Sequence, residues 1–155
     1  GNYAPGMMPS REAKDAGYAE IIYLDAEEHK YVEEVGAANF FCVKDNILYT
    51  PELTGTILPG ITRDSIIQLA RQMGHEVVET KVEADFAMDA DEAFCCGTAA
   101  VISPIGQITL GGKTATYADG STPGEVTQKL YDALTNIQNE VGEDIFGWLH
   151  PVPGM

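Results

Sequence analysis

Apolar positions along the chain recur at helical spacing in some segments and at strand spacing in others, with Gly, Pro and Asn between them. Apolar residues three and four positions apart indicate one buried face of a helix, whereas short apolar or alternating runs indicate strands. The helical pattern covers 9–17, 62–73, a single turn at 84–88, and a long helix that begins near Pro123. The strand pattern covers 20–25, 39–43, 47–50, 77–82, 92–96, 100–104 and 107–110. Strands and helices mixed without strict β–α–β alternation predict a single α+β (mixed α/β) domain.

Turn residues predict how these elements are joined. The polar turn at 44–46 separates two apolar runs and therefore predicts a β-hairpin. Ile105 and Gly106 predict a second hairpin between the two strands on either side of them. Residues 51–60 are rich in Pro, Gly and Thr, which predicts a loop that leads into the next helix.

The two longest helices have recognisable ends. Gly74 is expected to cap the C-terminus of the helix at 62–73. Ser121 or Thr122 is expected to be the N-cap of the last helix. After it, 146–153 is expected to pack as an irregular strap. The side chains expected to face inward are Ile66, Ile67, Leu69 and Ala70 in the first of these helices and Leu130, Tyr131, Leu134 and Ile137 in the last.

The composition is that of an ordinary globular domain, with 45% hydrophobic and 21% charged residues among 155. Asp and Glu total 24 against 9 Lys and Arg, which gives a net charge of −15. Such a surface repels a phosphate backbone and argues against nucleic acid as a partner. No apolar run approaches the roughly 20 residues needed to span a membrane, and the first residues lack the pattern of a signal peptide.

The cysteines and histidines predict neither a disulfide framework nor a metal site. Cys95 and Cys96 are adjacent, so a strand points them to opposite faces and they pair poorly. With Cys42 they are expected to pack as small hydrophobic residues in a reducing cytoplasm. The histidines lack metal-ligand spacing; they are His29, His75 and His150.

The segment Leu58-Pro59-Gly60-Ile61-Thr62-Arg63 is a Gly-containing loop that opens the predicted helix. Unpaired backbone N–H groups and the positive end of the helix dipole gather at such a start. The amides of Ile61 and Thr62 would therefore suit a phosphate. From the residues alone, an ordinary helix start that binds nothing explains the same pattern.

The segment Gly97-Thr98-Ala99-Ala100 follows the strand predicted at 92–96. Small residues let the backbone approach a ligand closely, and Thr98 adds a hydroxyl. Considered alone, these residues are better explained by a tight turn between two strands. Two such segments in one small domain nevertheless favour a shared anionic ligand.

Two adjacent acids, Glu33 and Glu34, lie in an extended segment ahead of Gly36-Ala37-Ala38. Successive side chains of a strand point to opposite faces, so one of the two acids faces inward. An inward carboxylate beside small residues could keep a heterocyclic nitrogen protonated. Two solvated acids in an acidic protein are the alternative interpretation.

Taken together, these motifs resemble the branched-chain amino acid aminotransferases, which are class IV (fold-type IV) pyridoxal-phosphate enzymes. The matching segments occur in the family's order: GNY at 1–3, EHKYVEEVGAANFF at 28–41, TP-LTG-ILPGITRDS across 50–65, GTAAVISPIG at 97–106 and GWLHPV at 147–152. The resemblance implies that 1–155 is the C-terminal pyridoxal-phosphate-binding domain, with the smaller N-terminal domain absent. The implied fold is a D-amino-acid-aminotransferase-like large domain, in which twisted mixed β-sheets form a pseudo-barrel flanked by helices.

The resemblance also implies a role for individual residues around pyridoxal 5'-phosphate. Glu34 would pair with the ring nitrogen, and Tyr3 would hydrogen-bond the phenolic oxygen of the ring. Leu58 would pack on one face of the ring. The phosphate would be bound by the amides of Ile61 and Thr62 and by the hydroxyl of Thr98. The substrate carboxylate would be bound by the backbone of Thr98, Ala99 and Ala100, next to Tyr3.

The family's Schiff-base lysine lies five residues before the tyrosine that corresponds to Tyr3, so it falls outside the chain. The chain alone is therefore expected to lack catalytic residues and to be inactive. Ala37 replaces a Thr found in some members, and Ala100 and Ser103 stand where some members carry a redox-active cysteine pair. The resemblance thus describes a cofactor platform that needs the remainder of the enzyme for turnover.

The implied reaction of the parent enzyme is amino transfer between a branched-chain L-amino acid (Leu, Ile or Val) and 2-oxoglutarate. The implied assembly is a cytoplasmic homodimer that binds small molecules and neither nucleic acid nor a membrane. D-amino-acid aminotransferases and aminodeoxychorismate lyases share the architecture and the glutamate, although the ILPGITRDS and GTAAVISPIG strings favour the branched-chain type. A non-catalytic cofactor-binding fragment is a further alternative.

Overall fold

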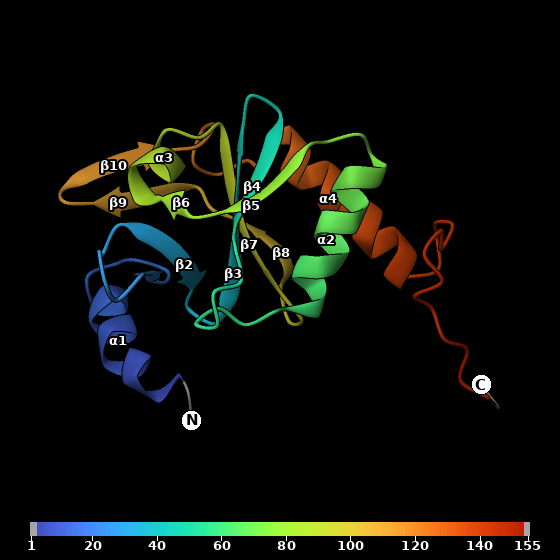
Figure 1. Ribbon diagram of the computed structural model, residues 1–155, viewed down its shortest axis with the longest axis horizontal. Helices are drawn as coiled ribbons and strands as arrows, with labels where there is room; N and C mark the ends of the chain where they lie inside the picture. Colours follow the sequence, from blue (N-terminus) through green and yellow to red (C-terminus); the bar gives the residue numbers. More distant parts are fainter. Residues whose placement is uncertain (1–2, 154–155) are drawn as a thin grey trace.

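The computed structural model describes residues 3–153, and its centre is an eight-stranded sheet (Figure 1). The strands of this sheet are β1 (Ile22–Leu24), β2 (Tyr31–Val35), β3 (Ala38–Lys44), β4 (Ile47–Pro51), β5 (Val77–Thr80), β6 (Val82–Glu83), β7 (Glu92–Gly97) and β8 (Val101–Pro104). A separate two-stranded sheet contains β9 (Gln107–Leu110) and β10 (Lys113–Thr116). The helices are α1 (Met7–Asp15), α2 (Ile61–Gln72), α3 (Ala84–Met88) and α4 (Glu125–Gln138), with a 3-10 turn at Ala4–Gly6.

The strand pairing curls the large sheet back on itself. β2, β3, β4 and β5 are neighbours in that order; only the pair β4 and β5 is parallel. A single residue, Lys81, separates β5 from β6, and β6 pairs antiparallel with β2. The path therefore returns to the strand from which it began, as the predicted pseudo-barrel requires.

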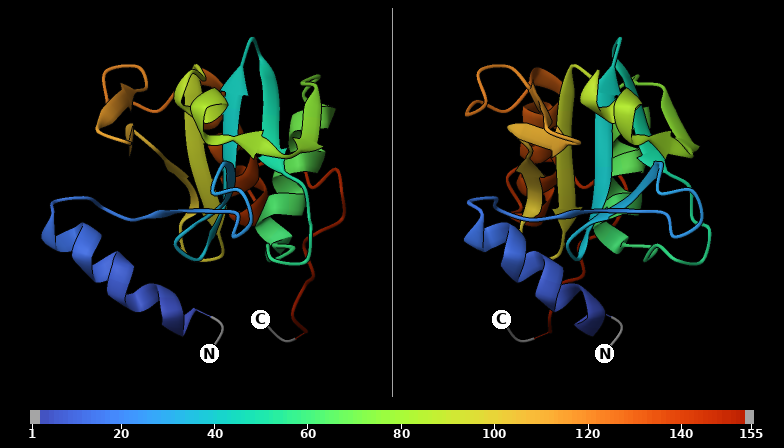
Figure 2. Two further views of the ribbon diagram at one scale, coloured as in Figure 1. Left: turned by 60° about the vertical axis from the view of Figure 1, so that its left-hand side comes forward. Right: turned by 90° about the vertical axis from the view of Figure 1, so that its left-hand side faces the viewer.

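Helices α2 and α4 lie together against one face of the sheet (Figure 2). Buried side chains of both helices pack there with Phe41 and Phe94, whose rings stack at 5.0 Å between centroids. The inward residues of α2 are the predicted ones, since its apolar positions recur every three or four residues. The opposite face carries a second core, which includes Phe40, Cys42 and Ile108.

The prediction of a hairpin around Ile105 and Gly106 is wrong. β8 pairs with β7, whereas β9 pairs with β10, a strand that the hydrophobic pattern did not predict. The turn of this second hairpin is Gly111-Gly112, where both residues have positive φ angles of 56° and 78°. Positive φ at consecutive turn positions suits the tight turns that join antiparallel strands, and glycine adopts it without a steric penalty. Likewise, the strand predicted at 77–82 is divided into β5 and β6.

The structure also corrects the beginning of α4. Its N-cap is Gly124, not Ser121 or Thr122. The backbone amides and hydroxyls of those two residues instead donate to the carboxylate of Asp119 in the preceding turn. Tyr131, predicted to face inward, is 39% exposed.

The remaining differences are small. α1 begins at Met7, before the predicted Pro9, and it buries no residue. The hairpin of β3 and β4 is confirmed, with positive φ at Asp45 and Asn46. The residue that follows the C-cap of α2 is Gly74, again with positive φ. The irregular tail is confirmed too: its side chains Phe146, Trp148 and Leu149 pack against the core beside α4.

The N-terminus of α4 is held by a carboxylate from the sheet. Glu92 of β7 accepts hydrogen bonds from the backbone amides of Val126 and Thr127, at 3.0 and 2.8 Å, and from the Thr127 hydroxyl at 2.7 Å. Negative charge and hydrogen-bond acceptors are favourable at this end of a helix. Glu92 therefore joins α4 to the sheet.

Replacing Glu92 with Ala should lower the free energy of unfolding by about 1–2 kcal/mol, because the first turn of α4 loses its acceptor. Urea denaturation of the protein measures this change. Glu125→Ala is the matched control, since Glu125 lies in the same turn but makes only an exposed ion pair with Lys129. Equal stability of the two variants would contradict the capping role of Glu92.

Candidate active site

Three connecting segments come together at one end of the sheet. They are the β2–β3 turn, the loop 52–60 that enters α2, and the β7–β8 turn, and all three lie at the lower end of the sheet in Figures 1 and 2. The strand register explains this placement, since Asn39 is opposite Glu34 on one side and opposite Cys96 on the other. The backbones of neighbouring strands are about 4.8 Å apart, so the backbones at Glu34 and Cys96 are roughly 10 Å apart across the sheet.

The buried carboxylate at this end belongs to Glu34, which is 7% exposed. Its Oε1 accepts a hydrogen bond from the Leu58 amide at 3.2 Å, and its Oε2 accepts one from the Tyr3 hydroxyl at 3.4 Å. Burial raises the pKa of Glu34, and the bonds from Leu58 and Tyr3 offset part of that rise. The neighbouring Glu33 is less buried and accepts a bond from Thr56 at 2.6 Å.

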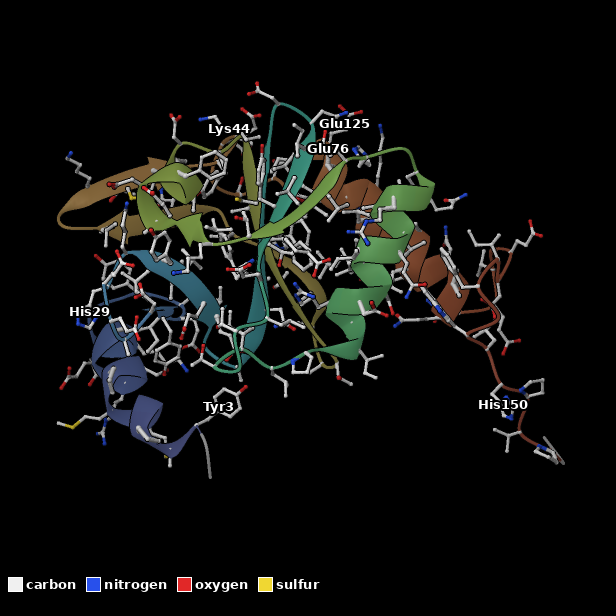
Figure 3. All side chains as sticks on the ribbon, viewed as in Figure 1. Tyr3, His29, Lys44, Glu76, Glu125 and His150 are labelled. Carbon is white, nitrogen blue, oxygen red and sulfur yellow. The ribbon has the colours of Figure 1, made fainter. Side chains whose placement is uncertain are left out.

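Tyr3 directly precedes the 3-10 turn that leads into α1, and its side chain is 45% exposed. Figure 3 shows the phenol directed from the start of α1 toward the sheet. Partial burial, followed by the nearby charge of Glu34, raises the pKa of the Tyr3 hydroxyl. The phenol therefore stays protonated and can donate to the carboxylate at neutral pH.

A cavity of about 420 Å³ opens between these groups. Its lining includes Tyr3, Glu34 and Leu58, so three of the residues that the resemblance implies border one space. The side chain of Leu58 is 56% exposed although its backbone is hydrogen-bonded to Glu34. Ile61, Thr62 and the residues 98–100 lie outside this lining.

The N-terminus of α2 lies next to the cavity. Gly60 is the N-cap, in an extended conformation with φ −66° and ψ 136°, and no side chain caps the helix. The amides of Ile61 and Thr62 belong to the first turn, where helical amides have no partner within the helix. Ile61 is 85% exposed, so this helix start is accessible from solvent.

The β7–β8 turn contains Thr98, Ala99 and Ala100, and all three are exposed. The turn ends at Val101, whose φ of 56° is in the left-handed region. A β-branched residue is strained there, by about 1–3 kcal/mol, and such strain persists only where the surrounding structure holds it. Val101 is held by its pairing with Gly97 across the hairpin.

Sequence reasoning assigned no site role to two buried polar residues beside the loop 52–60. Arg63, which is 4% exposed, donates to the Pro51 carbonyl and to Glu79, each at 2.9 Å. Asn39, which is 6% exposed, donates to the Leu58 carbonyl at 2.9 Å. In the sequence, Asn39 is a polar residue at the start of an apolar strand, and Arg63 lies in the first turn of a predicted helix. Neither pattern identifies the hydrogen-bond partner of the side chain.

Within residues 3–153, no group of three or more His, Cys, Asp and Glu side chains could hold a metal ion. Figure 3 shows His29 and His150 on distant parts of the molecule. In the same described range, no helix is long and apolar enough to cross a membrane. Cys42, Cys95 and Cys96 are free thiols, and burial raises the pKa of each.

The chain belongs to the class IV aminotransferases, whose family model matches residues 1–108. Branched-chain amino acid aminotransferase 2, chloroplastic, from Humulus lupulus is 48% identical over 96% of this chain and 36% of that protein. The crystal structure of the branched-chain amino acid aminotransferase of Escherichia coli superposes with a TM-score of 0.85, at 38% identity, over 97% of this chain and 48% of that one.

A third relative is the branched-chain aminotransferase of the thermophilic archaeon Thermoproteus uzoniensis, solved with norvaline, which has a TM-score of 0.82 at 36% identity. The match covers 96% of this chain and 47% of that one. The chain therefore spans less than half the length of these relatives. The fold is confirmed as that of the fold-type IV branched-chain aminotransferases.

Replacing Tyr3 with Phe should raise the pKa of Glu34 further, because the carboxylate loses one donor that stabilises its charged form. When folding raises the pKa of a carboxyl group, protonation of that group stabilises the folded state. Its contribution to stability therefore falls as the pH rises from 4.5 through the folded-state pKa. A ¹³C NMR titration of Glu34 in the cofactor-free protein measures the pKa, and urea denaturation at several pH values measures the stability. Tyr18→Phe is the control, because the Tyr18 phenol is exposed and lines a different cavity. An unchanged titration in Tyr3→Phe would remove Tyr3 from this role.

Proposed function

We propose that the full-length protein containing this chain uses pyridoxal 5'-phosphate to transfer the amino group of leucine, isoleucine or valine to 2-oxoglutarate. The observation that carries the proposal is the buried carboxylate of Glu34 at the wall of a cavity that Tyr3 and Leu58 also line. We further propose that the full-length protein is a homodimer, as the family resemblance implies.

The groups at the cavity suit the ring of this cofactor. The ring supplies an electron sink for the substrate, and this works best when its nitrogen is protonated. Glu34 provides a negative charge for that nitrogen in a poorly hydrated setting. A cation placed beside Glu34 would also relieve the cost of burying its charge, since an opposite charge favours the ionised form. The amide of Leu58 donates to one oxygen of this carboxylate.

The start of α2 suits the phosphate. The amides of Ile61 and Thr62 point out of the first turn, and the helix dipole adds a partial positive charge there. Gly60 allows the helix start to pack against Asn39, because a Cβ atom at this position would overlap Asn39 Oδ1. In this arrangement the ring and the phosphate are bound by adjacent parts of one loop and helix, which fixes the orientation of the cofactor.

The β7–β8 turn is proposed to complete the site. Thr98 would offer its hydroxyl to the phosphate, and the backbone of Thr98, Ala99 and Ala100 would receive the substrate carboxylate. Two features support this: the turn lies at the same end of the sheet as Glu34, and its residues are small and exposed. The pairing of Val101 with Gly97 holds the end of the turn in one conformation although Val101 has a positive φ angle.

We propose that the chain alone does not turn over. The proton transfers of the reaction need a lysine at the cofactor, and no described lysine lines the Glu34 cavity. Four of them instead pair with acidic side chains: Lys14, Lys30, Lys44 and Lys129. The substrate-binding surface that the smaller domain contributes in this family is a further requirement.

The full-length protein is expected to form glutamate from L-leucine and 2-oxoglutarate when pyridoxal 5'-phosphate is present, whereas residues 1–155 alone form none. A coupled glutamate assay on both proteins at equal concentration measures this difference. In a parallel assay D-alanine replaces L-leucine, and the pyruvate formed is measured. Activity with D-alanine alone would show that the substrate class is wrong, and turnover by residues 1–155 would show that the chain contains a sufficient catalytic base.

In the full-length protein, Glu34→Gln should lower kcat by about 100-fold or more, since a neutral amide does not stabilise a protonated ring nitrogen. Glu33→Gln is the matched control, because Glu33 is the adjacent acid and lines the same cavity, but it accepts its hydrogen bond from Thr56. Steady-state kinetics with L-leucine give both values. Similar kcat values for the two variants would exclude Glu34 as the partner of the ring.

A further inference from the structure

The peptide of Leu58 is held from both sides by two residues that face each other across β2 and β3. Its N–H donates to Glu34 Oε1 at 3.2 Å, and its carbonyl accepts from Asn39 Nδ2 at 2.9 Å. The same carbonyl accepts a second bond, from the Gly60 amide at 2.8 Å. The carbonyl and the amide of one loop residue are thus both fixed to the sheet.

Asn39 is well suited to fix this peptide. It is 6% exposed and is opposite Glu34 in the strand register, so the two side chains project from the same face of the sheet. β3 is paired along its other edge with β7, which makes it an interior strand with little freedom to move. A buried carboxamide that loses its partner carries a desolvation penalty, and this favours keeping the bond to Leu58 intact.

The other end of the carboxamide lies against the helix start. A Cβ atom added at Gly60 would overlap Asn39 Oδ1, so the carboxamide occupies the space that the glycine leaves open. Asn39 therefore contacts the loop at Leu58, next to the Glu34 cavity, and at Gly60, next to the amides of Ile61 and Thr62.

We propose that Asn39 is a positioning residue for the cofactor: by holding the Leu58 peptide it fixes the carboxylate of Glu34, the side chain of Leu58 and the start of α2 relative to one another. This inference rests on the proposed function. Asn39 itself lies outside the cavity lining and acts through Leu58 and Gly60. Without its bond, the loop retains the Glu34 contact but loses the second anchor that defines its orientation.

The test uses the full-length protein with Asn39→Ala. Asn39→Ser, which keeps a small polar side chain, is a second variant in case Asn39→Ala does not fold. The matched control is Thr50→Val. Thr50 is fully buried, and its hydroxyl donates to the Phe40 carbonyl at 2.7 Å, so this variant also removes one buried bond from a side chain to the backbone. Unlike Asn39, it leaves the Leu58 peptide untouched.

Three readouts separate positioning from general stability. In the Asn39 variants, the Kd for pyridoxal 5'-phosphate should rise about tenfold, which corresponds to the loss of about one hydrogen bond. The pH dependence of the absorption spectrum of the bound cofactor should shift, because the Glu34 carboxylate is less well oriented. Amide hydrogen exchange at Leu58 in the cofactor-free protein should accelerate about tenfold. Thr50→Val should lose stability in denaturation and leave all three readouts within about twofold of wild type.

Equal Kd values, spectra and Leu58 exchange rates in the Asn39 variants and Thr50→Val would overturn the inference. Failure of the proposed function has a different signature, because the wild-type protein itself would then not bind pyridoxal 5'-phosphate. In that case the Leu58 exchange rate in the cofactor-free protein still decides whether Asn39 holds the peptide.

Discussion

A carboxylate removed from water must be matched by hydrogen-bond donors, and the site described here depends on how this is achieved at Glu34. Burial raises the pKa of Glu34, so its charge is expensive unless the surroundings stabilise it. One donor is the Leu58 amide and the other is the Tyr3 hydroxyl, from segments 24 and 31 residues away in the sequence. The folded chain therefore has to bring three distant segments to one point before this carboxylate has both donors.

The topology of the sheet accomplishes this with short connections. The β2–β3 hairpin contains β3, and β7 of the β7–β8 hairpin pairs with β3. Both turns therefore leave the sheet at the same end of β3. Loop 52–60 reaches that end because Arg63 holds the Pro51 carbonyl where the loop begins, while Asn39 holds Leu58 near its finish. Rigid strands thus determine where an exposed loop lies, which is the usual way in which a fold positions a site.

Much of this architecture could be predicted from residue patterns, because α2 and the hairpin of β3 and β4 have strong periodicity and clear turn residues. Of the residues that line the Glu34 cavity, the family resemblance implies Tyr3, Glu34 and Leu58. Alternation along β2 indicates only that one of two acids is buried. The predicted pairing of 107–110 with 100–104 is wrong because a strand signal does not specify its partner. The pattern does not predict β10, which follows the Gly111-Gly112 turn. The cap of α4 and the anchor at Asn39 could not be predicted, because Glu92 and Asn39 act on residues 34 and 19 positions away.

The strongly acidic chain can bind an anionic ligand, because its net charge acts over longer distances than the hydrogen bonds that would hold the anion. Its net charge of −15 acts over distances at which salt screens it, with a Debye length of about 8 Å under physiological conditions. The first-turn amides of α2 act at hydrogen-bond distance, where screening is weak. The buried charge of Arg63 in the same turn is paired with Glu79, so it adds little net field and serves to anchor the loop. Local backbone geometry, more than the overall charge, therefore determines whether a phosphate can bind, and Asn39 contributes to that geometry by packing against Gly60.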